Sequence, residues 1–348
     1  MLRGFAAFYV FAGHVLLERV LQKQSGLGFL FRFGQEAVML FFLISGFVVY
    51  YSTSKHGDTS FSSYFARRAR RIYPIFLLAL ILSWACAAQA LGRLPDFSMK
   101  QWLGNLLMLQ ELQNLKGGQL GGGVAPLHGN FPLWSLSYEW WFYVLFYPVY
   151  RFIPAARRLH VVAGLSLIGF VTFSLHPNQV SSVLWYFILW WVGAELARSR
   201  LERVPLTFVS QRRSLAYLTL FCALAGGAVL AAVIARTPLA FGIHPVLEFR
   251  HFCACLIFLA AGLLWSRARW IGFDRLFAPF AFFAPISYAI YVFHFPLAVS
   301  SSYLAFLPFP ALQIAGYVLV TLVAAYLAEV PFQNWINRVL RRSRPGKG

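Results

Sequence analysis

Ten apolar stretches restrict most strongly how this chain can fold. Each is close to the roughly 20 apolar residues that a helix needs to cross the hydrocarbon core of a bilayer. That core offers no water to backbone N–H and C=O groups, so a spanning segment must be a helix or part of a closed barrel. The sequence therefore predicts an all-α, polytopic integral membrane bundle of about ten transmembrane helices. Their expected ranges are 5–21, 34–53, 73–91, 131–150, 159–175, 181–197, 214–235, 246–265, 280–301 and 310–329.

Composition and charge placement agree with a membrane protein. The chain is 59% hydrophobic and 12% charged, with a mean hydropathy of +0.65. Its net charge of +19 is typical of nucleic-acid-binding proteins, but the basic residues stand in short connections between the apolar stretches. Alternate connections hold 22 and 8 of the 30 Lys and Arg residues, so the positive-inside rule predicts that both termini are cytoplasmic. We expect the lipid bilayer as a partner and no nucleic acid.

Residues 1–348 are expected to form a single domain without an appended soluble domain, in which 92–130 is an external loop. The glycine-rich segment 116–123 of this loop follows no predicted strand and lacks the P-loop lysine, so we interpret it as a mobile loop over the outer mouth. No small-residue cleavage site follows the first apolar stretch, which indicates a retained helix. The four cysteines fall within predicted spans without metal-ligand spacing, so no metal site is expected.

Arg3 and His14 are the most informative polar pair. They lie eleven residues apart, which places them on nearly the same face of a helix and about 16 Å apart along it. Ionisable groups within a membrane mark substrate or proton pathways by default. Histidine exchanges protons near neutral pH, so His14 is a candidate for acid–base catalysis. The alternative is a core histidine hydrogen-bonded to a neighbouring helix.

Four arginines stand within five residues at the predicted cytoplasmic mouth of the third span. Guanidinium groups bind phosphates in a planar, bidentate manner, so this density favours a polyphosphate donor such as coenzyme A or a nucleotide. Arg68 and Arg71 share one helix face. The alternative is a topology signal alone. The predicted donor-binding residues here are Arg67, Arg68, Arg70, Arg71 and Tyr73.

Two further spans carry polar residues at depth. Glu139 is a lone carboxylate among aromatic residues, about 12 Å into its helix, and this depth matches that of His14. A buried carboxylate needs a partner, so we predict that Glu139 pairs with His14. Ser45 could line the same cavity or simply allow close packing beside a glycine. The candidate cavity residues in these spans are Glu36, Ser45, Trp134, Ser135 and Ser137.

Near the end of the chain, Ser287, Tyr291 and His294 fall at positions i, i+4 and i+7 and form a polar stripe on one helix face. This alignment favours a cavity wall over an interfacial aromatic belt. Glu329 is expected to be structural and paired with Arg338 or another arginine of the tail. The candidate cavity residues here are Ser287, Tyr288, Tyr291 and His294.

Taken together, these clusters resemble the membrane acyltransferase-3 family, which O-acylates carbohydrates. The resemblance covers nearly the whole chain and depends on five motifs in order. They are Arg3-x10-His14, Gly34 to Phe47, Arg68-x2-Arg71-Ile-x-Pro74, Trp134-Ser-Leu-Ser-x-Glu139 and Ser287-Tyr-x2-Tyr291-x2-His294, followed by Glu329-Val-Pro331.

The resemblance implies an enzyme of the acyltransferase class that transfers groups other than amino-acyl groups. It implies a donor arginine at Arg3, an essential histidine at His14, a donor-binding pair at Arg68 and Arg71, and a functional position at Glu139. The expected co-substrate is acetyl-CoA or another acyl-CoA, with no bound cofactor. The expected acceptor is an envelope polysaccharide or a lipid-linked sugar, and the expected location is a bacterial inner membrane.

The predicted mechanism uses His14 as general base on an acceptor hydroxyl, with Glu139 fixing its tautomer. An acyl-enzyme on His14, Ser45 or Ser135 is the alternative route. Three other classes of protein stay open at this point: a secondary transporter, a proton-coupled sugar-lipid flippase and a purely structural membrane partner. Donor turnover would separate the acyltransferase from the flippase, and the absence of a matching inverted half argues against the transporter.

Overall fold

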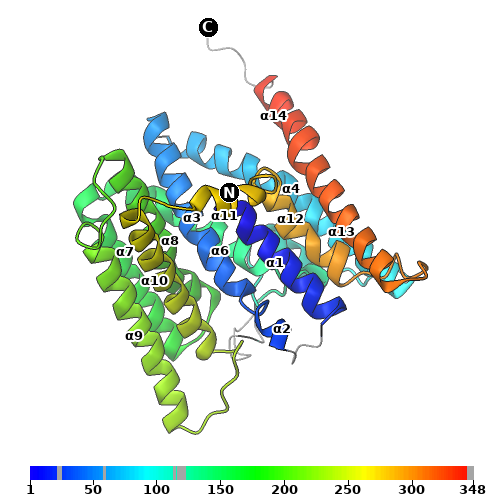
Figure 1. Cartoon of the computed structure of the whole chain (residues 1–348), viewed down its shortest axis with the longest axis horizontal. Coiled ribbons are helices and arrows are strands. Elements are labelled where there is room, and N and C mark those ends of the chain that lie inside the picture. Colours follow the sequence, from blue (N-terminus) through cyan, green and yellow to red (C-terminus); the bar gives the residue numbers. More distant parts are fainter. Residues whose placement is uncertain (22–25, 58–59, 113–114, 116–122, 343–348) are drawn as a thin grey trace.

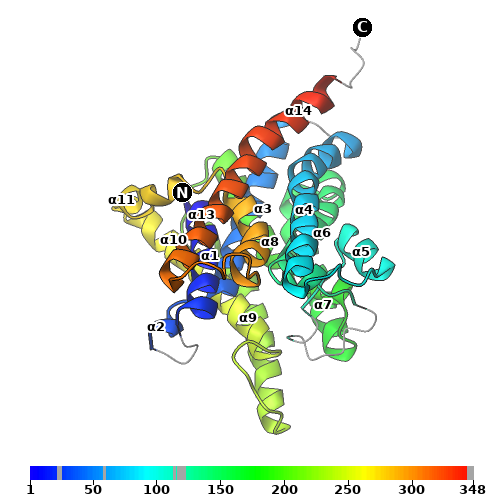
Figure 2. The same cartoon turned by 90° about the vertical axis from the view of Figure 1, so that its right-hand side faces the viewer.

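The computed structural model describes residues 1–21, 26–57, 60–112, 115 and 123–342, and among these it contains helices and no strand. Figures 1 and 2 show a bundle of helices. The predicted all-helical membrane fold is confirmed. The glycine-rich segment 116–123 lies outside the described residues except for its last glycine.

Most helices coincide with the apolar stretches of the sequence. In chain order they are α1 (Leu2–Arg19), α2 (Gly26–Phe29), α3 (Gly34–His56), α4 (Phe61–Leu91), α5 (Met99–Leu106), the 3₁₀ turn η2 (Leu127–Gly129), α6 (Leu133–Phe152), α7 (Ala155–Leu175), α8 (Gln179–Leu201), α9 (Arg212–Ile234), α10 (Val246–Arg267), α11 (Phe273–Phe277), η3 (Ala278–Ala281), α12 (Ser287–His294), the π-helical turn η4 (Phe295–Val299), α13 (Pro310–Leu327), the π-helical turn η5 (Ala328–Phe332) and α14 (Gln333–Arg342).

Seven of the described helical stretches are long and apolar enough to cross a membrane. They are α3, α4, α7, α8, α9, α10 and the stretch Pro310–Leu340, which joins α13 to α14 through η5. A helix also lies in each of the other three predicted ranges, namely α1, α6 and α12 with η4. The number of ten membrane spans is therefore not confirmed. Charged side chains account for part of the difference between the ten predicted spans and the seven found. For example, α1 contains Arg3, Glu18 and Arg19 within its 18 residues.

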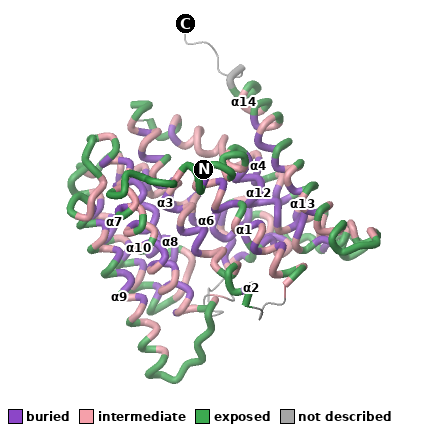
Figure 3. Tube along the Cα trace, viewed as in Figure 1, coloured by how far each residue is buried: buried purple, intermediate pink, exposed green. Residues whose placement is uncertain are grey.

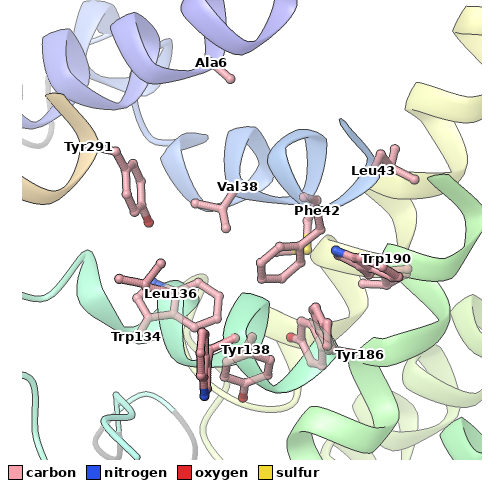
Figure 4. Packing of buried hydrophobic residues seen from close by; sticks show 14 of the residues in the cluster. Ala6, Val38, Phe42, Leu43, Trp134, Leu136, Tyr138, Tyr186, Trp190 and Tyr291 are labelled. Atoms are coloured by element: carbon pink, nitrogen blue, oxygen red, sulfur yellow. The ribbon is translucent and has the colours of Figure 1, made fainter. Parts of the chain in front are cut away.

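The core of the bundle is built around α8, which is buried over most of its length (Figure 3). Trp185, Trp190 and Trp191 of this helix are almost completely buried. In Figure 4, Trp190 and Tyr186 of α8 lie close to Phe42 of α3 and Tyr138 of α6. Aromatic packing of this kind stabilises a core through both area and ring geometry. This packing holds α3 and α6, which carry much of the site, against α8.

Gly46 allows α3 and α8 to approach closely. A Cβ atom at this position would lie 2.0 Å from the carbonyl oxygen of Trp190. We expect Gly46→Ala to lower the free energy of unfolding by about 1–3 kcal/mol, because a packed helix interface accommodates an extra methyl group only by moving apart. Thermal unfolding in detergent would measure the change. Gly227→Ala on α9 is the matched control, because nothing lies within 4 Å of its added Cβ, and equal stability of the two variants would contradict the prediction.

The connection between α4 and α6, predicted as an external loop, folds back onto the bundle. Buried Asn105 of α5 fixes it, because its amide donates to the carbonyl oxygens of Gln101 (2.9 Å) and Ala125 (3.0 Å). Its side-chain oxygen accepts a hydrogen bond from the backbone N–H of Leu127 at 3.1 Å. Because buried polar groups must be paired, these contacts tie the two halves of the connection together. The connection thereby becomes a wall of the site.

Candidate active site

Two neighbouring cavities in the bundle share part of their walls. The arginine cavity, of about 220 Å³, is lined by Arg3 of α1, Arg68 and Arg71 of α4, and Ser45 and Glu139 of α3 and α6. The histidine cavity, of about 750 Å³, is lined by His14 of α1 together with residues of α3, α6 and the α4–α6 connection. Val38 and Tyr291 line both cavities, so the cavities meet at these two side chains. Arg3 and His14 thus occupy separate chambers along α1.

The start of α1 places Arg3 in the arginine cavity. Gly4 makes this possible, because a Cβ atom there would lie 2.0 Å from the carbonyl oxygen of Phe280. The backbone of α1 consequently packs directly against η3. No hydrogen bond to another described residue holds the Arg3 guanidinium, so its donors are available to an anion that enters the cavity.

Arg68 and Arg71 differ in how the protein holds them. Arg68 donates to the Ser52 hydroxyl at 2.8 Å. Arg71 forms a two-pronged ion pair with Glu329 of η5, and the second contact of the pair measures 3.1 Å. Glu329 also accepts a hydrogen bond from the backbone N–H of Ala289 at 3.3 Å. The predicted pairing of Glu329 with the tail was wrong. Its π-helical turn instead directs it toward α4, as such turns often do at functional sites.

Glu139 belongs to the arginine cavity and does not pair with His14. It accepts hydrogen bonds from the hydroxyls of Ser45, at 2.7 Å, and of Tyr143. The Trp190 indole N–H donates to Ser45 in turn, at 3.2 Å. The prediction that Glu139 orients His14 was therefore wrong. Equal depth in the membrane does not place two side chains together, because the angular positions of α1 and α6 around the bundle also decide the contact.

His14 pairs with His294 instead. The two imidazoles join through His14 Nδ1 and His294 Nε2, which lie 2.8 Å apart. His294 Nδ1 lies 3.1 Å from the carbonyl oxygen of Ile290, which can only accept, so this nitrogen carries the proton. In the neutral pair, His294 Nε2 is then the acceptor and His14 Nδ1 the donor. This leaves a lone pair on His14 Nε2, the arrangement that a general base requires.

Tyr291 and Val38 form the junction between the cavities. Tyr291 donates or accepts a 2.7 Å hydrogen bond with the Ser135 hydroxyl. Figure 4 shows the Tyr291 ring reaching from α12 toward Leu136 of α6, with Val38 of α3 beside it. The three members of the predicted polar stripe on α12 are therefore separated: Tyr291 stands at the junction, His294 lies beside His14, and Ser287 lines neither cavity. Tyr288, the candidate next to the stripe, lines the arginine cavity.

The histidine cavity contains residues that motif analysis missed. Glu18 lies one turn beyond His14 on the same helix face, a spacing that could have identified it. Gln35 of α3 and Glu111 of the α4–α6 connection add an amide and a carboxylate. No sequence pattern identified Glu111 as a cavity residue, because nothing in the sequence shows that the connection between α4 and α6 folds inward. The aromatic part of the wall consists of Phe131, Trp134, Tyr291 and Phe295.

A third cavity, the arginine vestibule, has a volume of about 240 Å³ and lies next to the arginine cavity. It is lined by Arg67, Arg70 and Arg71 of α4 and by Gln333 and Asn337 of α14. Arg71 lines both the vestibule and the arginine cavity, so the two are neighbours. All four arginines of the basic cluster thus line a cavity, two of them only the vestibule.

Four other candidates lie outside the two main cavities. Tyr73 donates to the carbonyl oxygen of Leu106 (3.0 Å) and fastens α5 to α4. Glu36 forms an ion pair with Arg250 of α10. The two serines donate to nearby backbone carbonyls, Ser137 to Gln110 at 2.9 Å and Ser287 to Ala284 at 2.8 Å. These four side chains hold the structure together and do not face the cavities in which we expected them.

Comparison with known proteins agrees with this architecture. A family model described as an acyltransferase domain matches residues 1–330. Acyltransferase MdmB of Streptomyces mycarofaciens is 31% identical over 183 residues, which are 47% of this chain and 42% of that protein. "Putative acetyltransferase ORF330" of Acidianus two-tailed virus is 27% identical over 196 residues, which are 56% of this chain and 53% of that protein.

The matched regions thus span about half the length of these curated relatives. No solved structure matches the chain. The family model covers nearly the whole sequence, including every residue that lines the arginine and histidine cavities. The chain therefore belongs to the acyltransferase-3 family, and its described residues include seven helical stretches that are long and apolar enough to cross a membrane.

Proposed function

We propose that this protein moves an acyl group, acetyl in the simplest case, from cytosolic acyl-CoA to a hydroxyl of an envelope or lipid-linked carbohydrate. The observation that carries the proposal is the meeting of an arginine-lined and a histidine-lined cavity at Tyr291 and Val38. One cavity offers cations to a phosphorylated donor, and the other offers a base to an acceptor. On this proposal the arginine side faces the cytoplasm of a bacterial cell, as the distribution of basic residues predicts.

The distance along α1 fits the donor. Arg3 and His14 are eleven residues apart, or about 16 Å along the helix. The pantetheine arm between the diphosphate and the sulfur has about thirteen bonds. At the extension of a polypeptide, roughly 1.2 Å per bond, the arm is about 16 Å long. A donor whose diphosphate contacts Arg3 can therefore present its thioester near His14.

The chemistry then needs one proton transfer in each direction. His14 Nε2 takes the proton of the acceptor hydroxyl, and the oxygen forms a bond to the thioester carbonyl carbon. The carbon–sulfur bond breaks, and the imidazolium returns the proton to the sulfur, which gives coenzyme A and the ester. His294 keeps His14 in the required tautomer. Glu139 contributes in the other cavity, where it holds Ser45 and Tyr143 and offsets the charge of Arg3.

The histidine cavity suits a polyhydroxylated acceptor. Sugars are held by aromatic faces together with carboxylate and amide acceptors, and this wall combines Trp134 and Phe295 with Glu18 and Gln35. An acceptor in this cavity lies on the opposite side of the Tyr291–Val38 junction from the donor phosphates. The two substrates therefore approach from opposite ends of one path.

Narrowing the junction should block transfer without preventing donor binding. Tyr291→Trp is expected to lower kcat by about 10²-fold, because a displacement of the thioester by an ångström has an effect of this size. The dissociation constant for acyl-CoA should stay nearly constant, since the arginines are untouched. Tyr326→Trp, at an exposed position on α13, is the matched control. Parallel loss of binding and turnover in the junction variant would contradict a role in passage.

The first test is donor binding and turnover by purified protein in nanodiscs. We expect wild type to bind acetyl-CoA, and Arg68→Ala to weaken binding by roughly 10- to 150-fold, the effect of one lost charge-assisted hydrogen bond. Arg213→Ala on the exposed start of α9 is the control. If wild type has no measurable affinity for any acyl-CoA, the proposed function is wrong and a transport role becomes the working hypothesis.

A further inference from the structure

We propose that the arginine vestibule is a second anion site, which binds the 3′-phosphoadenosine end of the donor and makes the enzyme selective for 3′-phosphorylated coenzyme A. This inference depends on the proposed function, because it concerns the same donor. It adds two residues of α14, Gln333 and Asn337, to the binding machinery. Both lie beyond residues 1–330, which the family model matches.

The vestibule is lined by polar side chains only. Three of its five lining residues are arginines, and the other two carry amides. Arg67 Nη1 donates to the Ser63 hydroxyl (2.9 Å), and Arg70 Nε donates to the Ala66 carbonyl (3.2 Å). Both arginines also line the vestibule. Guanidinium groups clustered in this way match the three oxygens of a phosphate monoester.

Gln333 indicates that the ligand carries more than a phosphate. Its amide N–H donates to the carbonyl oxygen of Arg70 at 2.8 Å, which docks the start of α14 onto α4. Its side-chain oxygen is buried and receives no hydrogen bond from any described residue. A buried acceptor in this state is destabilising until a donor arrives. An adenine amino group is such a donor, and Asn337, one turn later on the same face, can add a further contact.

The relation between the cavities fits the shape of coenzyme A. Its diphosphate joins two parts, the 3′-phosphoadenosine and the pantetheine arm. Arg71 lines both the vestibule and the arginine cavity, so a diphosphate beside Arg71 would direct one part into each. The turn η5 and the start of α14 fix this arrangement, because Glu329 of η5 holds the Arg71 side chain and Gln333 of α14 holds the Arg70 backbone.

The experiment compares acetyl-CoA with 3′-dephospho-acetyl-CoA on wild-type protein in nanodiscs. We expect KM for the dephospho donor to be roughly tenfold or more higher, with a similar kcat, because the missing phosphate loses charge-assisted hydrogen bonds. In Arg67→Gln combined with Arg70→Gln, the ratio of the two KM values should approach one. Asn337→Ala should lower the ratio of the two KM values in part. The control is Arg338→Gln, which removes one positive charge from the exposed position of α14 next to Asn337 and should keep the wild-type ratio.

The outcomes separate the two proposals. If wild type uses acetyl-CoA but treats both donors alike, the vestibule assignment is wrong and the proposed function stands. The same holds if Arg338→Gln abolishes the preference as fully as the double variant, because general surface charge would then be the cause. If wild type neither binds nor uses either donor, the proposed function itself fails.

Discussion

His14→Gln is expected to lower kcat for acyl transfer by about 10²- to 10⁴-fold, the contribution of a positioned general base. Glutamine retains a polar side chain but has no group that exchanges a proton near neutral pH. Donor binding should be almost unchanged, because Arg3, Arg68 and Arg71 lie in the other cavity. Transfer measured at saturating donor, together with an independent binding isotherm, would test both statements. Full activity in this variant would exclude His14 from the chemistry.

Substitutions of His294 provide the matched controls for His14. His294→Leu removes the acceptor for His14 Nδ1 and should reduce kcat by roughly 10- to 100-fold, the usual effect of losing such an orienting partner. His294→Gln restores an acceptor oxygen and should recover part of the activity. An equal loss in both variants would indicate that His294 acts through packing alone.

Arg71→Ala is expected to destabilise the protein by about 3–5 kcal/mol, because Glu329 is buried and would lose its charged partner. Thermal unfolding in detergent would report the loss. Donor binding should weaken as well, since Arg71 lines both the arginine cavity and the vestibule.

The double variant Arg71→Ala with Glu329→Gln separates these two effects. Removing both charges should restore most of the stability, because no unpaired carboxylate remains, while donor binding should stay weak. Recovery of binding along with stability would show that Arg71 serves the fold and makes no contact with the donor.

The sequence contained enough information to predict the helical bundle and most of the polar residues that line the arginine cavity. Apolar length and helical periodicity are local properties, so a helix lies in every predicted range. The basic cluster of α4 and the stripe of α12 were also visible locally, because residues three or four apart share a helix face. These patterns identified Arg68 and Arg71 as donor-binding residues and Tyr291 as a cavity residue, and the structure places all three in the wall of the arginine cavity.

The pairing of side chains across helices could not be predicted in the same way. His14 and His294 are 280 residues apart, and their contact depends on how α1 packs against α12. The partner of Glu329 depends on the π-helical turn η5, which changes the direction of the side chain within one turn. Glu36 is a similar case, because its partner Arg250 comes from α10. The sequence gives the depth of a residue along the membrane normal, but a contact also depends on where its helix stands in the bundle and how that helix is rotated.

The junction at Tyr291 and Val38 has a consequence for the permeability of the membrane. A protein with wide chambers on both sides of its centre would leak protons and small ions unless a dry constriction separates them. On the proposed function, Tyr291 and Val38, which line both cavities, would form this constriction, with the Tyr291 hydroxyl bonded to Ser135. On the proposed mechanism only a slender chain crosses this point, and coenzyme A and the sugar each remain in their own compartment. The reaction would then export an acyl group while the electrochemical gradient is kept.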